Sequence, residues 1–421
     1  MSVLVIGGGG REHAICATLL KSPKVDKLYC IPGNAGISEI AECHNDIGVL
    51  DFDKILTFVK NHKDIDLTVV APDDPLALGL VDLLESNGYK AFGPKKNAAI
   101  IEASKAFSKY LMKKYNIPTA EYEEFNNYDA ALEYVKKAKY PLVVKADGLA
   151  LGKGVIICQN VDEGIAAVTE MMVDNKFKDA GKTIIVEEFL VGKEVSILSF
   201  TDGKTIIPMV SSQDHKRAHD NDEGLNTGGM GTFSPSQVYT KEIEKETLEK
   251  VIIPTIEAMN KEGRQFKGVL YFGLMLTSDG VKVLEYNARF GDPETQVVLP
   301  RLDADLYDIF NACIDGNLDK VEIKWTDDAC VCVVIASGGY PESYKKGVEI
   351  SIKDLDDDIM LFHAGTKIVD NRLVTSGGRV IGVTAKGKNI DEAREKAYKN
   401  VDKVSFEGAF YRHDIGIKKY N

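Results

Sequence analysis

The first hundred residues alternate short strand-like runs with helical segments, and this alternation restricts the possible fold more than any other feature. The predicted strands Val3–Ile6, Lys27–Ile31, Leu67–Ala71 and Lys90–Phe92 each stop at a glycine or a proline. Short buried strands separated by helices predict a parallel sheet with helices on both faces. Ligands of such sheets bind at the carboxyl ends of the strands, so the turns after these strands are the first candidate site.

The rest of the chain divides into two further regions of mixed helix and strand. The long helical stretch Asn97–Tyr115 ends before Pro118, and a polar, glycine-rich stretch, Gln213–Pro235, interrupts the later strands. A loop of that length is usually functional, and this one is rich in charged residues and asparagine. Further strands are predicted at Leu142–Lys145, Val155–Cys158, Thr183–Glu187, Val195–Phe200, Gly268–Thr277, Val281–Glu285, Ala329–Ala336 and Arg379–Thr384. An amphipathic stretch is predicted at His13–Leu20, and helices at Asp162–Val173 and Asp391–Tyr398. We therefore expect three domains, residues 1–101, 102–326 and 327–421, with a small subdomain at about 120–192 inside the second.

Charge and cysteine usage narrow the class of protein. The 421 residues include 52 Lys and Arg against 64 Asp and Glu, a net charge of −12, which argues against nucleic acid and anionic membranes as partners. No apolar run reaches the length of a membrane span and no leader pattern is visible. The seven cysteines have no CxxC spacing, and Cys330 and Cys332 are expected to be buried on one strand face. We therefore expect a cytoplasmic protein with reduced thiols.

The four glycines Gly7–Gly10, followed by Arg11 and Glu12, stand between the first strand and the first helix. A dinucleotide-binding fingerprint requires glycine at both ends of G-x-G-x-x-G, and Glu12 or His13 occupies its last position here. The incomplete fingerprint argues against an oxidoreductase that binds a dinucleotide through these glycines. Backbone N–H groups at a helix N-terminus can still hold a single phosphate group, which is the reading we prefer to a simple tight turn.

A second glycine-rich segment runs from Lys145 to Val155. Lys145 ends an apolar strand, and the following loop contains Lys153 between Gly152 and Gly154. Because the strand lysine precedes the glycines, this is not a Walker A loop, but such a loop can close over a triphosphate. The ordinary alternative is a solvated hairpin.

The most informative segment is Leu284–Gln296. Glu285 and Asn287 are two residues apart on a predicted strand, so their oxygens face the same side, as hard donors suited to Mg²⁺. Arg289 continues this alternation if the strand continues, and it could hold a carboxylate or an acyl phosphate. Upstream, Glu187 ends another strand and leads to Glu194, a weaker signal for nucleotide binding. Together the segments predict an ATP- and metal-dependent site.

These segments resemble the phosphoribosylamine–glycine ligase family of the ATP-grasp superfamily. The resemblance rests on collinear segments: Lys145–Val155, Gln213–Arg217, Asn226–Gly231, Arg289–Gln296, Ser337–Pro341, Phe362–Lys367 and Phe406–Arg412. It implies an α/β chain with an N-terminal doubly wound parallel-sheet domain that binds substrate, an ATP-grasp domain whose small subdomain is a lid, and a C-terminal α+β domain.

The resemblance also implies the reaction. ATP phosphorylates the carboxylate of glycine, and the amine of 5-phosphoribosylamine attacks the glycyl phosphate to give glycinamide ribonucleotide, ADP and phosphate in de novo purine biosynthesis. ATP and Mg²⁺ or Mn²⁺ are the implied cofactors. Glycine and 5-phosphoribosylamine are the implied partners, and we expect a monomer.

Site residues follow from the resemblance by position. Lys105 and Lys145 would contact the ATP phosphates, with Lys153 of the glycine loop beside them, and Glu285 and Asn287 would bind the metal. Adenine and ribose would be held by Glu187, Leu190 and Glu194. Substrates would be bound by Gly9, Gly10, Arg11, Glu12, Asp214, Lys216, Asn226, Gly228, Gly229, Met230 and Arg289. Of these, Arg289, Lys145 and Asp214 are the predicted catalytic residues.

The chain departs from the family pattern at a few positions. Asp73 stands where the family often has Glu, and His219 and Leu225 stand where Gly and Pro are expected. The strand Gly268–Leu276 lacks the additional metal carboxylate found in many ATP-grasp enzymes. An ATP-grasp carboxylase or another carboxylate–amine ligase of purine metabolism is the alternative enzyme, and a non-catalytic nucleotide sensor is the alternative outside catalysis.

Overall fold

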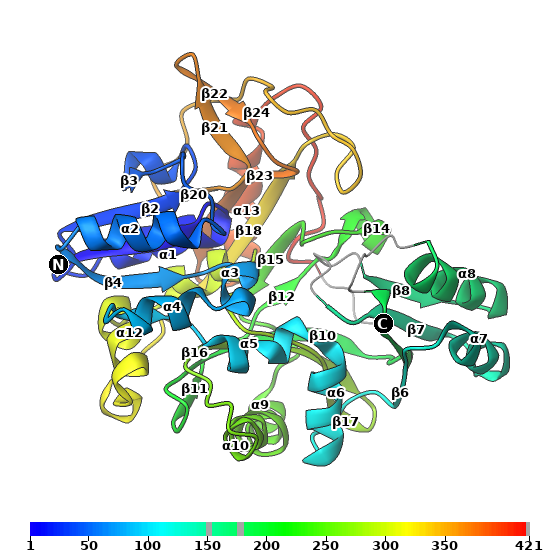
Figure 1. Ribbon diagram of the computed structural model, residues 1–421. Coiled ribbons are helices and arrows are strands. Elements are labelled where there is room, and N and C mark those ends of the chain that lie inside the picture. The colour runs from blue at the N-terminus through cyan, green and yellow to red at the C-terminus, as the bar shows by residue number, and fades with distance from the viewer. Residues whose placement is uncertain (149–153, 175–180, 418–421) are drawn as a thin grey trace.

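The structure is a computed structural model that describes residues 1–148, 154–174 and 181–417. Within these residues, the framework consists of four large β-sheets with helices packed against them. The N-terminal sheet and the small subdomain that carries α7 and α8 lie at opposite ends of the molecule, with the other two large sheets between them (Figure 1).

The N-terminal sheet has the strand order β3-β2-β1-β4-β5, and all its pairings are parallel. Along β1, Leu4 and Ile6 pack with helices α2 and α4, whereas Val3 and Val5 pack with α1 and α12 on the other face. The predicted parallel sheet with helices on both faces is therefore confirmed. Its elements are β1 (Ser2–Gly7), α1 (Gly10–Leu19), β2 (Lys27–Pro32), β3 (Glu42–Cys43), α2 (Phe52–Asn61), β4 (Ile65–Val70), α3 (Asp73–Leu78), α4 (Leu80–Ser86) and β5 (Ala91–Phe92).

Helix α1 is buried on nearly every side. Only Ala17 among its ten residues is not fully buried, so the predicted amphipathic pattern for His13–Leu20 was wrong. The helix is covered by its own sheet and also by α11 (Thr295–Val298), β20 (Ile359–His363) and α12 (Leu306–Asp315). The glycine-rich turn at its start is therefore enclosed by three regions of the chain.

The predicted helix Asn97–Tyr115 is interrupted at Ser104, giving α5 (Lys96–Ala103) and α6 (Lys105–Lys114). Ser104 adopts an extended backbone and its side chain accepts a hydrogen bond from the N–H of Phe107, which caps α6. The same hydroxyl donates to the carboxylate of Asp147, 3.1 Å away. The break thus joins α6 to the turn that follows Lys145.

The small subdomain contains an antiparallel sheet of order β6-β9-β7-β8, covered by two helices. Its elements are β6 (Tyr122–Phe125), α7 (Tyr128–Lys137), β7 (Leu142–Ala146), β8 (Val155–Cys158), α8 (Val161–Met172) and β9 (Ile184–Glu188). Its own apolar core is built from α7, α8 and the inner face of the sheet. The chain enters this small subdomain just before β6 and leaves it after β9.

The central sheet is antiparallel, with the order β11-β10-β16-β17. Its strands are β10 (Lys193–Thr201), β11 (Ile206–Pro208), β16 (Gly268–Thr277) and β17 (Gly280–Asn287), and it packs on α9 (Lys241–Thr247) and α10 (Ile253–Lys261). The predicted strands at Gly268–Thr277 and Val281–Glu285 are confirmed, and β17 extends to Asn287.

The fourth sheet joins two parts of the chain that lie a hundred residues apart. Its order is β12-β15-β18-β23-β20, so the first two strands come from the stretch predicted as a long polar loop, Gln213–Pro235. That stretch contains β12 (Gln213–Asp214), β13 (Arg217–His219), β14 (Glu223–Asn226) and β15 (Gly231–Ser234). The prediction that it is a loop without strands was therefore wrong. The other elements of this region are β18 (Ala329–Ala336), β19 (Ser351–Ile352), β20 (Ile359–His363), β21 (Thr366–Val369), β22 (Arg372–Thr375), β23 (Arg379–Gly387), α13 (Ile390–Val401) and β24 (Val404–Ser405).

Asn34 connects the N-terminal sheet to the C-terminal region. Its amide donates to the carbonyls of Gly8, 2.9 Å away, and His363, 2.7 Å away, and its carbonyl accepts from the N–H of Ile37 at 2.9 Å. We expect Asn34→Ala to lower the free energy of unfolding by about 2–4 kcal/mol, because it leaves buried polar groups without partners. Urea unfolding measures this, with the exposed Asn87→Ala as the control. Equal effects of the two substitutions would contradict the role given to Asn34.

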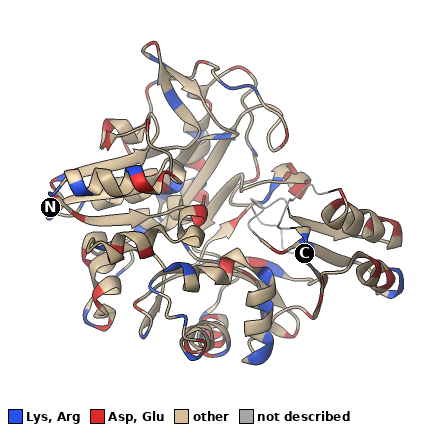
Figure 2. Ribbon diagram, viewed as in Figure 1, with Lys and Arg blue, Asp and Glu red and all other residues tan. Residues whose placement is uncertain are grey.

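Charged side chains are spread over the molecule (Figure 2), and two cysteines that were predicted to be buried lie in its core. Acidic and basic residues are scattered along all parts of the ribbon (Figure 2). None of the described helices is long and apolar enough to cross a membrane. Cys330 and Cys332 are fully buried on β18, as predicted, and burial raises the pKa of the Cys332 thiol to about 12.

Candidate active site

Glu285 and Asn287 lie at the end of β17 and face the same side of the central sheet. They pair in register with Gly273 and Tyr271 of β16, and Tyr286 between them points into the core. The ammonium of Lys216 lies 3.6 Å from Glu285 and 3.3 Å from Glu194. The pKa of Glu285 is lowered, chiefly by Lys216, so this carboxylate is ionised at neutral pH. Lys216 therefore balances the charge of these two carboxylates.

Glu285 and Asn287 suit Mg²⁺, which takes other ligands from water and phosphate, better than a metal ion coordinated by protein side chains alone. No group of three or more His, Cys, Asp or Glu residues gathers as a metal site within the described part of the chain. One carboxylate and one amide oxygen on a strand suit a hard ion that keeps water and phosphate oxygens as its other ligands. The residues therefore fit a metal ion that arrives with a nucleotide.

Lys145 is the penultimate residue of the apolar strand β7 and points toward Glu187 of β9. Its ammonium lies 2.9 Å from the Glu187 carboxylate and donates to the carbonyl of Leu284 at 3.3 Å. Lys109 of α6 lies 3.3 Å from the same carboxylate, so two ammonium groups share one buried anion. Burial lowers the pKa of Lys109 to about 8, although Glu187 acts in the opposite direction. This excess of positive charge suits a bound phosphate chain.

Lys105 stands one turn before Lys109 on α6 and also faces this site. Its ammonium donates to the carbonyl of Gly148 at 2.8 Å, and burial lowers its pKa. Glu285, Lys145 and Asp147 are among the charged groups that also affect the pKa of Lys105. Lys153, the other lysine predicted to contact phosphates, lies outside the described residues.

The residues predicted to hold the nucleoside lie between the lid and the central sheet. Leu190 is buried with Ala120 and Met275, and Leu284 packs against this small apolar cluster. Glu194 is the second residue of β10 and lies close to Lys216. Glu187 is 4% exposed, and its Oε1 atom has no hydrogen-bond partner among the described residues. An apolar cluster beside an unsatisfied acceptor has the chemistry of an adenine site.

The predicted substrate residues of the 214–230 segment converge on one turn. Gly229 has φ = +115°, and a Cβ atom there would lie 2.5 Å from Pro293 and 2.7 Å from the carboxylate of Asp214. Only glycine allows this close approach. Met230 is fully buried and donates its N–H to the carbonyl of His215, whereas Asn226 pairs with Arg217 across the β13–β14 hairpin. The structure thus brings Asp214 and Gly229 against the Arg289–Gln296 segment.

Arg289 lies beyond the end of β17, so the strand does not continue to this residue and the condition for its alternation with Glu285 and Asn287 is not met. Its guanidinium lies 2.9 Å from Glu102 of α5 and 3.9 Å from Asp73, the position that departs from the family pattern. Glu102 also accepts the N–H of Ala288 at 2.7 Å. Burial raises the pKa of Glu102 to about 7, against the effect of Arg289. Arg289 is therefore fixed from two helices of the N-terminal half.

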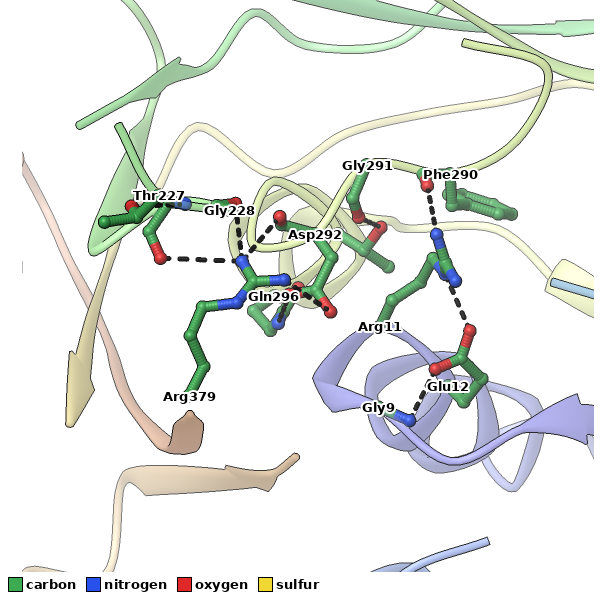
Figure 3. Close-up of polar contacts among 12 residues, drawn as sticks. Gly9, Arg11, Glu12, Thr227, Gly228, Phe290, Gly291, Asp292, Gln296 and Arg379 are labelled. Carbon is green, nitrogen blue, oxygen red and sulfur yellow. Dashed lines mark hydrogen bonds and ion pairs between the residues drawn. The ribbon is translucent and has the colours of Figure 1, made fainter. Parts of the chain in front are cut away.

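The glycine-rich turn at Gly9–Glu12 meets the same segment (Figure 3). The N–H of Gly9 donates to Glu12 at 2.6 Å, and Arg11 donates to Glu12 at 2.7 Å and to the carbonyl of Phe290 at 3.1 Å. A Cβ atom on Gly10 would lie 2.5 Å from the amide of Gln296. Glu12 therefore already caps one of the N–H groups predicted to hold a phosphate.

Several residues of the site were not predicted from the sequence. Lys109 could have been predicted from the sequence, because it lies four residues after Lys105 and on the same face of a helix. Glu102 and Arg379 gave no signal, because their partners are more than eighty residues away in the chain. Asp292 lies in the segment Leu284–Gln296, which the sequence indicates as important without assigning a role to Asp292. The structure pairs it with Arg379 and with the amide of Gln296.

Comparisons with known proteins agree on one family. The phosphoribosylglycinamide synthetase models match this chain over residues 1–102 (N domain), 103–295 (ATP-grasp domain) and 330–418 (C domain). The phosphoribosylamine–glycine ligase of Caldanaerobacter subterraneus subsp. tengcongensis is 49% identical, with 99% of each chain covered.

Solved structures give the same result. The phosphoribosylamine–glycine ligase from Thermotoga maritima superposes with a TM-score of 0.85 at 33% identity, covering 99% of this chain and 100% of that one. The biotin carboxylase domain of Hydrogenobacter thermophilus 2-oxoglutarate carboxylase, solved with MgADP and bicarbonate, has a TM-score of 0.73 at 16% identity, with 97% and 91% covered. The second likeness is one of fold.

Proposed function

The chain belongs to the phosphoribosylglycinamide synthetase family, and from that premise we propose how its residues carry out the ligation. The enzyme joins glycine to 5-phosphoribosylamine at the expense of ATP, giving glycinamide ribonucleotide, ADP and phosphate in de novo purine biosynthesis. The observation that best supports the assignment of roles is the position of Lys216. It extends from the substrate segment to both Glu194 and Glu285, which places the substrate residues beside the nucleotide and metal residues.

ATP binds between the lid and the central sheet. The adenine ring lies against the apolar cluster around Leu190, and Glu187 and Glu194 accept hydrogen bonds from the nucleoside. Lys105, Lys145 and Lys153 neutralise the phosphates, and Lys109 keeps Glu187 paired when Lys145 turns toward them. Glu285 and Asn287 would hold Mg²⁺ or Mn²⁺, and the ion would supply positive charge that stabilises the phosphates during transfer.

Glycine binds next to the terminal phosphate, with its carboxylate near Arg289. One carboxylate oxygen attacks the γ-phosphorus and ADP leaves, which forms the glycyl phosphate. Arg289, held by Glu102 and Asp73, balances the charge that develops on the transferred group. The buried turn at Gly229 and Met230 excludes water that would hydrolyse the acyl phosphate.

The amine of 5-phosphoribosylamine then attacks the carbonyl carbon and inorganic phosphate leaves. Asp214 stands beside Gly229, where its carboxylate can take up the proton that the amine loses. Gly9, Gly10, Arg11 and Glu12 approach the ribose phosphate, and Asn226, Gly228 and Lys216 complete the substrate site. In this arrangement most of the rate enhancement comes from positioning and electrostatics.

The remaining assignments are also proposals. We place domain boundaries at about residues 101 and 326, with residues 120–192 as the lid. We further propose that the enzyme acts in the cytoplasm as a monomer, and that Mg²⁺ or Mn²⁺ supports the reaction.

A coupled assay of ADP release tests the proposed function directly. With ATP, Mg²⁺, glycine and freshly prepared phosphoribosylamine, we expect ADP release that stops when either glycine or the amine is omitted. Replacing glycine by bicarbonate should give no ADP, which separates this ligase from a carboxylase. ADP release that is independent of glycine, or dependent on bicarbonate, would overturn the assignment.

A further inference from the structure

Arg379 lies at the start of β23, in the C-terminal region, and its side chain reaches into the candidate active site (Figure 3). Its Nη1 atom donates to the carbonyl of Gly228 at 2.6 Å and to the carbonyl of Asp292 at 2.8 Å. Its Nη2 atom lies 3.5 Å from the Asp292 carboxylate. One guanidinium group thus contacts two segments that are more than sixty residues apart in the chain.

These two segments are the ones on which the proposed glycine site depends. Gly228 belongs to the turn that contains Gly229, and Asp292 belongs to the segment that begins at Arg289. The backbone of Gly229 approaches Pro293 so closely that only glycine fits there. Arg379 donates to one carbonyl oxygen on each side of this contact, that of Gly228 and that of Asp292. The Nη1 atom supplies both of these bonds, while Nη2 of the same rigid, planar guanidinium faces the Asp292 carboxylate.

Tyr340 provides a second contact from the same region. Its hydroxyl accepts the N–H of Gly228 at 2.9 Å, so both polar backbone groups of Gly228 are held by side chains of the C-terminal region. The Tyr340 ring packs directly over Gly378, next to Arg379. The two side chains therefore form one unit with the start of β23.

The charges are arranged to keep this contact in place. Asp292 is flanked by Arg379 and Arg11, and the combined effect of these two cations lowers its pKa although burial acts to raise it. The amide of Gln296 donates to the same carboxylate at 2.8 Å. Asp292 is therefore an ionised, fully engaged anchor for Arg379.

We propose that Arg379 is a positioning residue of the ligase, which sets the Gly228–Gly229 turn against Asp292 so that the glycine site has its working geometry. Arg379 acts through these two segments and has no contact with the nucleotide residues of the lid among the contacts described. The inference rests on the proposed function, because glycine is the ligand whose site it shapes.

The test compares Michaelis constants in Arg379→Ala with those of the wild type. We expect the KM for glycine to rise about 10- to 100-fold, as for loss of hydrogen bonds to a charged group, while the KM for ATP changes less than about twofold. Added guanidinium ion should restore part of the glycine affinity. Arg372→Ala is the matched control. It removes an exposed arginine of β22 that pairs with Glu349, and it should leave both Michaelis constants unchanged.

Tyr340→Phe tests the same geometry with a smaller structural change. It removes only the hydroxyl that accepts from Gly228, and we expect a rise in the glycine KM in the same direction without a change in the ATP KM. This variant decides the question if Arg379→Ala does not fold.

The outcomes separate the inference from the proposed function. Equal changes in both constants, a fall in thermal stability with unchanged constants, or no rescue by guanidinium would overturn the role of Arg379. A wild-type enzyme without glycine-dependent ADP release would instead overturn the proposed function.

Discussion

Glu285→Gln should reduce kcat by a factor on the order of 10² to 10³ while leaving the fold intact, which is the range for removing one precisely placed charge-stabilising group. The substitution keeps the shape of the side chain but removes the negative charge. Lys216 keeps a carboxylate partner in Glu194, so little stability should be lost. Activity is measured by ADP release over a range of Mg²⁺ concentrations, and the fold is checked by circular dichroism and thermal unfolding.

A binding measurement makes this prediction specific for the metal. Mn²⁺ bound in the presence of ADP can be followed by electron paramagnetic resonance, and Glu285→Gln should weaken that binding at least tenfold, in the range for altered metal sites. Glu257→Gln, on the exposed face of α10 and 3.9 Å from Lys261, is the control and should behave as wild type. Normal Mn²⁺ binding with normal turnover in Glu285→Gln would remove this residue from the metal site.

Much of the fold could be predicted because its strands are buried and its turns are marked by glycine or proline. The parallel N-terminal sheet, the lid strands around Lys145 and the β16–β17 hairpin all follow from local pattern. Local pattern failed for α1, which was expected to be amphipathic and which contains His13. In the structure its imidazole accepts the N–H of His363, 350 residues away, and α1 is enclosed by that contact and others.

The polar stretch Gln213–Pro235 failed for a related reason. Its strands β12 and β15 are very short, and they are stable because β15 pairs with β18, a strand about a hundred residues later. Neither strand has enough apolar alternation to be recognised alone. The substrate turn at Gly229 is thus supported by the sheet of the C-terminal region, which gives Arg379 its access to the site.

The candidate site was predictable where its residues follow each other in the chain. Glu285 and Asn287 face the same side because a strand has a repeat of two. Arg289 did not follow this rule because the strand ends at Asn287, and its orientation is fixed by Glu102 and Asp73 from distant helices. Paired charges of this kind depend on the tertiary arrangement, and a single sequence contains no record of them.

Arg289→Met should abolish turnover and also destabilise the protein in a manner that depends on pH. Removing the guanidinium leaves the buried carboxylate of Glu102 without its cation, and breaking a buried ion pair costs about 3–5 kcal/mol. Activity should fall by at least about 10³, because the group that balances charge on the transferred phosphate is lost. ADP release and urea unfolding measure the two effects separately.

The sign of the pH dependence follows from Glu102. Burial raises its pKa in the folded protein from an ordinary value of 4.5 to about 7, so the folded state holds a proton that the unfolded state has already lost. Stability from this group therefore falls as pH rises between these values, by up to about 3 kcal/mol at 1.36 kcal/mol per pH unit. Loss of Arg289 raises this pKa further, so the deficit of the variant should be small near about pH 5 and large near about pH 8.

A double substitution separates the structural role of the pair from the catalytic role of Arg289. In Arg289→Met/Glu102→Gln the unpaired charge is gone, and the amide can still accept the N–H of Ala288. We expect most of the lost stability to return and its pH dependence to disappear, while activity remains abolished. If the double variant regained activity together with stability, Arg289 would serve only to neutralise Glu102. If the single variant were equally unstable at both pH values, Glu102 would not be the group left uncompensated.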